Sequence, residues 1–163
     1  IEQDNFDNYE MVTGSAFLDI MPVYWFKKFY TKNMNTKLVY FSINYDGYFK
    51  FYPKHKLDKD VLQLFNNDQK NKKNNKTRAV GPDCSNIINS WFAKTHKCYL
   101  FKSNWTDVKN KNFQLMFLDF CENIIKKNRK TNFSEWLDFR KKNIIKNKSK
   151  LSVSNKDFLA IKI

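Results

Sequence analysis

The chain has few of the residues that build the commonest nucleotide-binding and catalytic sites. Its 163 residues include only three glycines and three prolines. Neither GxGxxG nor GxxxxGK[ST] occurs, and both need glycine so that the backbone can approach a phosphate, which excludes these two nucleotide sites. The two histidines, His55 and His96, belong to no HExxH or Cys-His arrangement, and GxSxG is missing. We therefore predict a non-enzymatic protein without a cofactor.

Cysteines and long apolar runs are also scarce. Cys84, Cys98 and Cys121 are odd in number, widely spaced and outside any CxxC motif. This pattern favours neither a disulfide framework nor a zinc site, so we expect inert thiols in a reducing compartment and no bound metal. No run of about 18 apolar residues is present, so no transmembrane helix is predicted.

Positive charge is what the chain has in excess. It carries 30 basic and 16 acidic residues, a net charge of +14, and only three of the basic residues are arginine. A basic body favours a polyanionic partner, namely nucleic acid, an anionic membrane or an acidic protein. The scarcity of arginine argues against bidentate recognition of phosphate or guanine. An AT-rich coding sequence would also yield this abundance of lysine and asparagine.

Aromatic residues make up 17% of the chain and are densest in residues 23–52. Aromatic and β-branched residues suit a pleated, half-buried surface. Asp46-Gly47 predicts a type I′ hairpin turn, because Gly and Asp tolerate the positive φ that such a turn needs. Strands are predicted at residues 16–20, 25–32, 37–45, 48–52, 97–102 and 113–120.

Other segments give weaker signals. Asp58 is predicted to cap a short helix over residues 59–65. Residues 66–77 are polar and of low complexity, which predicts a disordered loop. Asn132 and Glu135 form a capping box that predicts a helix. Its apolar stripe contains Phe133, Trp136, Leu137, Arg140 and Ile144. Residues 1–12 are read as an acidic lead-in, 13–146 as the domain and 147–163 as a basic polar tail.

The order of these elements resembles a pleckstrin-homology domain over residues 13–146. Trp25-Phe26-Lys27-Lys28-Phe29-Tyr30 is similar to the family's second strand. Ser134-Glu135-Trp136-Leu137-Asp138-Phe139-Arg140 is similar to its capping helix, with Trp136 in the position of the family's tryptophan. The resemblance implies a mainly β fold, a bent antiparallel barrel of about seven strands capped by a C-terminal α-helix.

The resemblance also implies recruitment to a membrane through anionic phospholipid headgroups. The lysines expected to bind them are Lys27, Lys28 and Lys32, helped by Lys50 and Lys54. The predicted first strand has no lysine and the second no arginine, so binding should depend on charge density more than on headgroup stereochemistry. The expected protein is a monomer on the cytosolic face of a membrane, in the cytoplasm.

Two alternative partners remain open. One is an acidic protein docked on the barrel and helix. The other is single-stranded nucleic acid, whose bases stack on exposed aromatic side chains next to basic ones. The second alternative requires exposed Phe or Tyr in a groove, whereas the sequence places these residues in the core.

Overall fold

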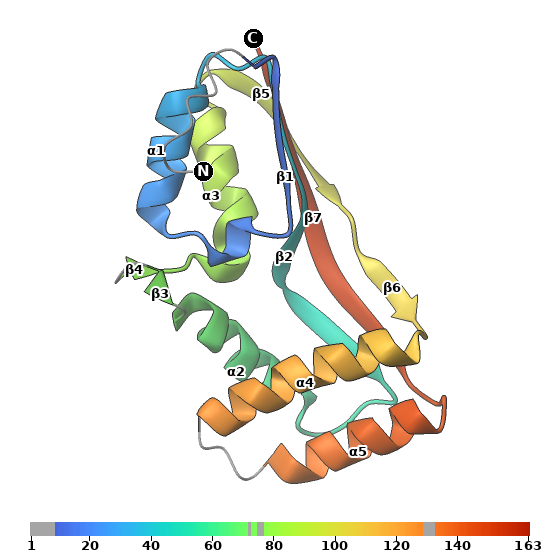
Figure 1. Cartoon of the computed structure of the whole chain (residues 1–163). Coiled ribbons are helices and arrows are strands. Elements are labelled where there is room, and N and C mark those ends of the chain that lie inside the picture. The colour runs from blue at the N-terminus through green and yellow to red at the C-terminus, as the bar shows by residue number, and fades with distance from the viewer. Residues whose placement is uncertain (1–8, 72, 75–76, 129–132) are drawn as a thin grey trace. The chain divides into compact units, whose positions relative to one another are not determined.

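The computed structural model describes residues 9–71, 73–74, 77–128 and 133–163. Figure 1 shows its helices and strands. In chain order these are β1 (Met11–Ser15), a 3-10 helix (Leu18–Ile20), α1 (Val23–Asn33), β2 (Leu38–Tyr52), α2 (Asp58–Asn71), β3 (Lys73–Asn74), β4 (Thr77–Arg78), a second 3-10 helix (Gly81–Asp83), α3 (Cys84–Phe92), β5 (His96–Lys102), β6 (Trp105–Val108), α4 (Lys111–Lys127), α5 (Ser134–Ile145) and β7 (Lys150–Lys162).

The prediction of a mainly β, barrel-like fold is wrong. The described residues form a mixed α/β structure with five α-helices. Its main sheet is open, with the order β1-β2-β7-β5 and with β6 also paired to β7. β1 runs parallel to β2, so the sheet is not purely antiparallel either. The structure therefore lacks the closed barrel that the pleckstrin-homology resemblance implied.

The chain divides into two compact units. The first contains residues 1–47, 69–103 and 155–163, and the second contains residues 48–68 and 104–154. β2, β7 and α2 each contribute residues to both units.

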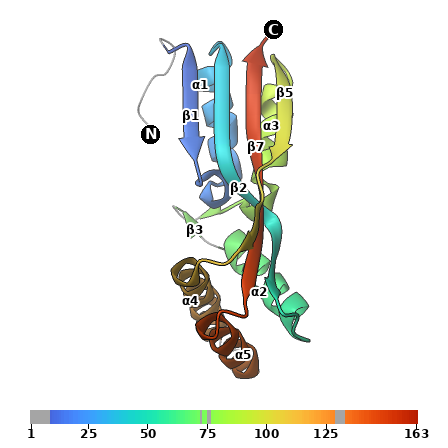
Figure 2. The ribbon, with the colours of Figure 1, turned by 90° about the vertical axis from the view of Figure 1, so that its right-hand side faces the viewer.

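In the first unit, two helices cover one face of a four-stranded sheet. α1 and α3 lie on the same side of β1, β2, β7 and β5 (Figures 1 and 2). β5 is antiparallel to β7, with His96 opposite Lys162 and Lys102 opposite Lys156. The buried core between helices and sheet contains Leu18, Trp25, Phe26, Phe29, Val39, Phe41, Val80, Cys84, Ile88, Phe92, Phe158 and Ala160.

Residues 25–32, predicted as a strand, lie in helix α1. Trp25, Phe26, Phe29 and Asn33 are the buried positions, and this 3–4 residue spacing is that of one helix face. The Trp25 and Phe29 rings stack with centroids 4.7 Å apart. Tertiary packing of these rings thus overrides their preference for strands.

Asp46 and Gly47 do not form a hairpin turn. They lie inside β2, which continues from Leu38 to Tyr52. Gly47 has the positive φ (96°) that the sequence indicated, but the chain goes on in the same strand. The two strands predicted at 37–45 and 48–52 are therefore one, and the positive φ marks an irregularity in it.

The second unit is built around aromatic packing between strands and helices. β6 pairs with β7, and α4 and α5 lie side by side (Figure 1). The ring centroids of Phe49 and Phe117 are 5.0 Å apart, and those of Phe51 and Trp136 are 6.0 Å apart. Residues 113–120 were predicted as a strand, but they belong to α4, whose first turn is capped by Asn110 through the Phe113 N–H.

Of the remaining predicted segments, some are confirmed by the structure and others are wrong. The strand at 97–102, the helix after Asp58 and the C-terminal helix are confirmed as β5, α2 and α5. Trp136 is fully buried, as predicted. The predicted tail at 147–163 is wrong, because β7 occupies most of it. In the predicted loop at 66–77, α2 continues to Asn71. Asn132, half of the predicted capping box, and residues 1–8 of the acidic lead-in lie outside the described residues.

The first unit contains a buried histidine whose titration should affect stability. His96 packs against Phe92. In the neutral ring, Nε2–H donates to the Thr36 carbonyl oxygen at 2.9 Å and Nδ1 accepts from the Thr95 hydroxyl at 2.8 Å. Burial lowers the pKa of His96 from its ordinary value of 6.5, Thr36 opposes this shift and Lys162 adds to it.

We therefore expect the free energy of unfolding to fall as the pH drops below about 6.5, because the unfolded chain then binds a proton that folded His96 resists. Urea denaturation above and below this pH measures the effect. His96→Gln should have a shallower pH dependence than the unmodified protein. Identical pH profiles for the two proteins would show that His96 is not the responsible group.

Candidate functional site

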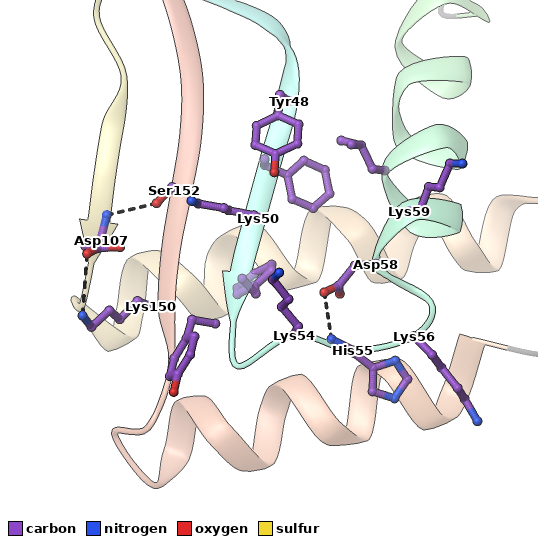
Figure 3. Close-up of a pocket in the computed structure, with 14 residues that line it drawn as sticks. Tyr48, Lys50, Lys54, His55, Lys56, Asp58, Lys59, Asp107, Lys150 and Ser152 are labelled. Carbon is purple, nitrogen blue, oxygen red and sulfur yellow. Dashed lines mark hydrogen bonds and ion pairs between the residues drawn. The ribbon is translucent and has the colours of Figure 1, made fainter.

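The second unit contains a pocket of about 560 Å³ with a basic lining. Its volume lies in the range of small-molecule and cofactor sites. Residues from β2, the loop after it, the start of α2, β6 and β7 surround it (Figure 3). The lining residues are Tyr48, Phe49, Lys50, Phe51, Tyr52, Lys54, His55, Lys56, Asp58, Lys59, Leu62, Asp107, Lys150 and Ser152.

The alternation of side chains along β2 gives the pocket its aromatic and basic groups. Phe49 and Phe51 are buried in the unit's core, so their neighbours point to the opposite face of the strand. Tyr48 and Tyr52 are 51% and 63% exposed, and Lys50 lies exposed between them. Figure 3 shows the Lys50 side chain extending toward Ser152 on β7. Two exposed aromatic rings thus flank an ammonium group on one strand face.

An ion pair between the buried Arg140 and the half-buried Asp58 fixes the loop that follows β2. The Arg140 guanidinium donates to Asp58 Oδ1 and to the Pro53 carbonyl oxygen. Trp136 Nε1 donates to the same Asp58 oxygen at 2.7 Å, and the His55 N–H donates to Asp58 Oδ2 at 2.9 Å. Both ends of the loop, Pro53 and Asp58, are therefore tied to α5.

The ion pair also changes the electrostatics of the pocket. Arg140 is fully buried, and burial lowers its pKa, while Asp58 opposes that shift. Arginine nevertheless remains protonated in proteins, so its charge neutralises the Asp58 carboxylate. The charge left in this part of the pocket lining is positive.

The lysines of the pocket differ in whether they have acidic partners. Lys56 Nζ lies 3.1 Å from Glu135, and Lys150 Nζ lies 3.6 Å from Asp107. Lys50, Lys54 and Lys59 have no ion-pair partner among the described residues. These three ammonium groups are therefore available to an anionic ligand.

The five lysines predicted to bind lipid fall into two groups. Lys27, Lys28 and Lys32 lie on α1 in the first unit. Lys50 and Lys54 line the pocket of the second unit. The strand predicted over residues 25–32 does not exist, so the first three of these lysines lie on a helix and not on a strand. Of the five, only Lys50 and Lys54 line this pocket.

The sequence did not single out Lys59, Lys150, Tyr48, Tyr52 or Arg140 as residues of a site. Alternation along β2 could have separated Tyr48 and Tyr52 from the buried phenylalanines, because period-2 patterning identifies one strand face. Arg140 carried a clearer signal, since it is a rare arginine on an apolar helical stripe. Lys150 could not be found, because its segment was read as a tail.

Other kinds of site are not seen in the described part of the chain. No group of three or more His, Cys, Asp or Glu residues there could hold a metal ion. Within the same ranges, no helix is long and apolar enough to cross a membrane. All three cysteines are free thiols, and Cys84 and Cys121 are buried.

Comparison with known proteins gives no further guide to this pocket. No protein-family model matches the sequence. No curated protein has significant similarity to it.

Proposed function

We propose that the second unit is a non-enzymatic module that binds single-stranded nucleic acid in the lysine- and tyrosine-lined pocket. The observation that carries this proposal is the exposure of Tyr48 and Tyr52 on either side of Lys50. Proteins that bind single strands without sequence preference combine a positively charged groove with aromatic rings on which bases stack. Both elements occur here on one strand face.

The spacing of these side chains suits a chain of nucleotides. Four residues along a strand span about 13 Å, so Tyr48 and Tyr52 can stack separate bases while Lys50 meets a phosphate between them. Lys54 and Lys59 extend the positive charge of the pocket beyond β2. Lysine serves here as a point charge. A point charge suits contact with the phosphate backbone better than sequence-specific recognition of the bases.

The same observation favours nucleic acid over an anionic membrane. Exposed tyrosines were what the nucleic-acid alternative required and what the sequence did not predict. The lipid hypothesis depended on Lys27, Lys28 and Lys32 forming a strand-based patch, and these residues lie on a helix in the first unit. The second unit has sixteen basic and eight acidic residues, and this charge supports binding of a polyanion.

Removing the pocket lysines should weaken binding of a fluorescein-labelled single-stranded oligonucleotide of mixed sequence. In the triple variant Lys50→Ala, Lys54→Ala, Lys59→Ala, the slope of log K against log salt should become shallower by about 2, since each phosphate contact to a single strand contributes about 0.7. Tyr48→Ala and Tyr52→Ala should each lower affinity by about 1–3 kcal/mol. Fluorescence anisotropy over a salt series measures both effects.

The matched control removes three lysines elsewhere, as Lys27→Ala, Lys28→Ala, Lys32→Ala on α1. This variant has the same net charge as the pocket variant, so equal losses in the two would show general electrostatic attraction and contradict the pocket assignment. Vesicles of neutral lipid with and without phosphatidylserine test the membrane alternative. If the oligonucleotide fails to bind and the anionic vesicles bind through the pocket lysines, the lipid hypothesis replaces this proposal.

A further inference from the structure

One face of the sheet in the first unit carries an apolar surface that no described helix of that unit covers. α1 and α3 pack on the opposite face, against Val39, Phe41, Phe158 and Ala160. Strand residues next to these point away from the helices. Figure 2 shows the four strands in front of α1 and α3. We call the uncovered side the open face; its large apolar side chains are Met11, Leu38, Tyr99, Phe101, Leu159 and Ile161.

Strand pairing makes these side chains neighbours. Met11 is opposite Leu38 on the parallel pair β1–β2. On β5 and β7, Tyr99 is opposite Leu159, and Lys97 is opposite Ile161. The Tyr99 and Phe101 rings stack with an interplanar angle of 9°. Phe101 is 49% exposed and Ile161 is 41% exposed. Contiguous exposed apolar surface of this kind marks interaction sites.

The chemistry of the open face disfavours a nucleic acid as its occupant. Most of its large side chains are aliphatic, and bases stack on aromatic rings. It also carries Asp157, which accepts hydrogen bonds from Ser103 Oγ, Tyr40 OH and the Ile43 N–H. Burial raises the pKa of this carboxyl, but the three hydrogen bonds outweigh that effect and lower it below its ordinary value. A phosphate backbone, which is charged along its whole length, would meet this fixed negative charge wherever it crossed the face. A protein segment that is acidic only at its edge can place an apolar side there instead.

Charge also favours an acidic protein over a second copy of this chain as the partner of the open face. Lys97, which is opposite Ile161 on this face, has no ion-pair partner among the described residues. The first unit holds fourteen basic and eight acidic residues, so two copies of the chain would repel each other. An acidic partner would instead be attracted and oriented by the same charges. We propose that the open face docks a protein segment that is apolar on one side and acidic at its edge.

Two synthetic amphipathic peptides with the same leucine-rich face test this proposal, one with glutamates and one with lysines on its polar side. Anisotropy with the full chain should show binding of the glutamate peptide and at least about tenfold weaker binding of the lysine peptide. Phe101→Ser and Ile161→Ser should each lower the affinity for the glutamate peptide by about tenfold or more, because each removes a large apolar contact. Circular dichroism verifies that both variants fold.

Phe120→Ser is the matched control, because Phe120 is 54% exposed but lies on α4 in the second unit. An equal loss in this variant, equal binding of the lysine peptide, or no binding of the glutamate peptide would each overturn the proposal. Sedimentation equilibrium tests whether a second copy of the chain covers the open face instead. A dimer that Ile161→Ser dissociates would identify a second copy of the chain and would also overturn it. Oligonucleotide binding by Phe101→Ser and Ile161→Ser is measured separately. A failure of peptide binding can therefore be distinguished from a failure of nucleic-acid binding in the pocket.

Discussion

Replacing Asp58 with alanine is expected to destabilise the protein by about 3–5 kcal/mol, the typical effect of leaving a buried charge without its ion-pair partner. The reason is Arg140, which is fully buried and whose guanidinium donates to Asp58 and to the Pro53 carbonyl oxygen. Without Asp58, a cation remains in a low-dielectric site with no counter-ion. The Trp136 indole N–H loses its acceptor as well. Urea denaturation followed by circular dichroism measures the change.

Two further variants separate this explanation from a general effect on α2. Asp60→Ala removes an exposed carboxylate from the same first turn, and it should cost only a few tenths of a kcal/mol, as a helix-dipole interaction. Arg140→Met removes the buried charge itself, so adding Asp58→Ala to it should cost much less than Asp58→Ala alone. Fully additive losses in the double variant would mean that the two residues are not coupled as the structure indicates.

The sequence predicted the elements whose local signals agree with their final packing. α2 and α5 were identified because their apolar spacing matches the face that they bury. α1 was misread because it is rich in Phe, Tyr and Trp, and α4 because it contains three phenylalanines. Strand propensity is weaker than packing. In α4, Phe113, Leu115 and Phe117 alternate as in a strand, yet the buried positions Phe117, Cys121 and Ile124 follow the helical period. A longer window would have favoured the helix.

The candidate site was harder to predict than the elements around it. Lys50 and Lys54 were chosen for a barrel that the chain does not form, and they line the pocket for a different reason, namely their position on and after β2. Tyr48 and Tyr52 looked like core residues because exposure depends on which face of β2 packs inward. Lys150 comes from a strand distant in sequence, and its place in the lining follows from tertiary structure alone.

Replacing Trp136 with alanine is expected to cost about 3–5 kcal/mol of stability, as for large-to-small changes of aromatic residues in a core. Trp136 is fully buried, packs edge-on against Phe51, and donates its indole N–H to Asp58. Alanine would leave a cavity between α5 and β2 and would remove one hydrogen bond from the Asp58–Arg140 pair. Trp136→Phe keeps most of the apolar volume, so it should lose less, mainly the hydrogen bond at about 1.5–3 kcal/mol to a charged acceptor. We therefore expect stability to rise from Trp136→Ala to Trp136→Phe to the unmodified protein, and the midpoints of urea denaturation measure this order. A Trp136→Ala protein with an unchanged midpoint would mean that α5 does not pack on β2 through this residue.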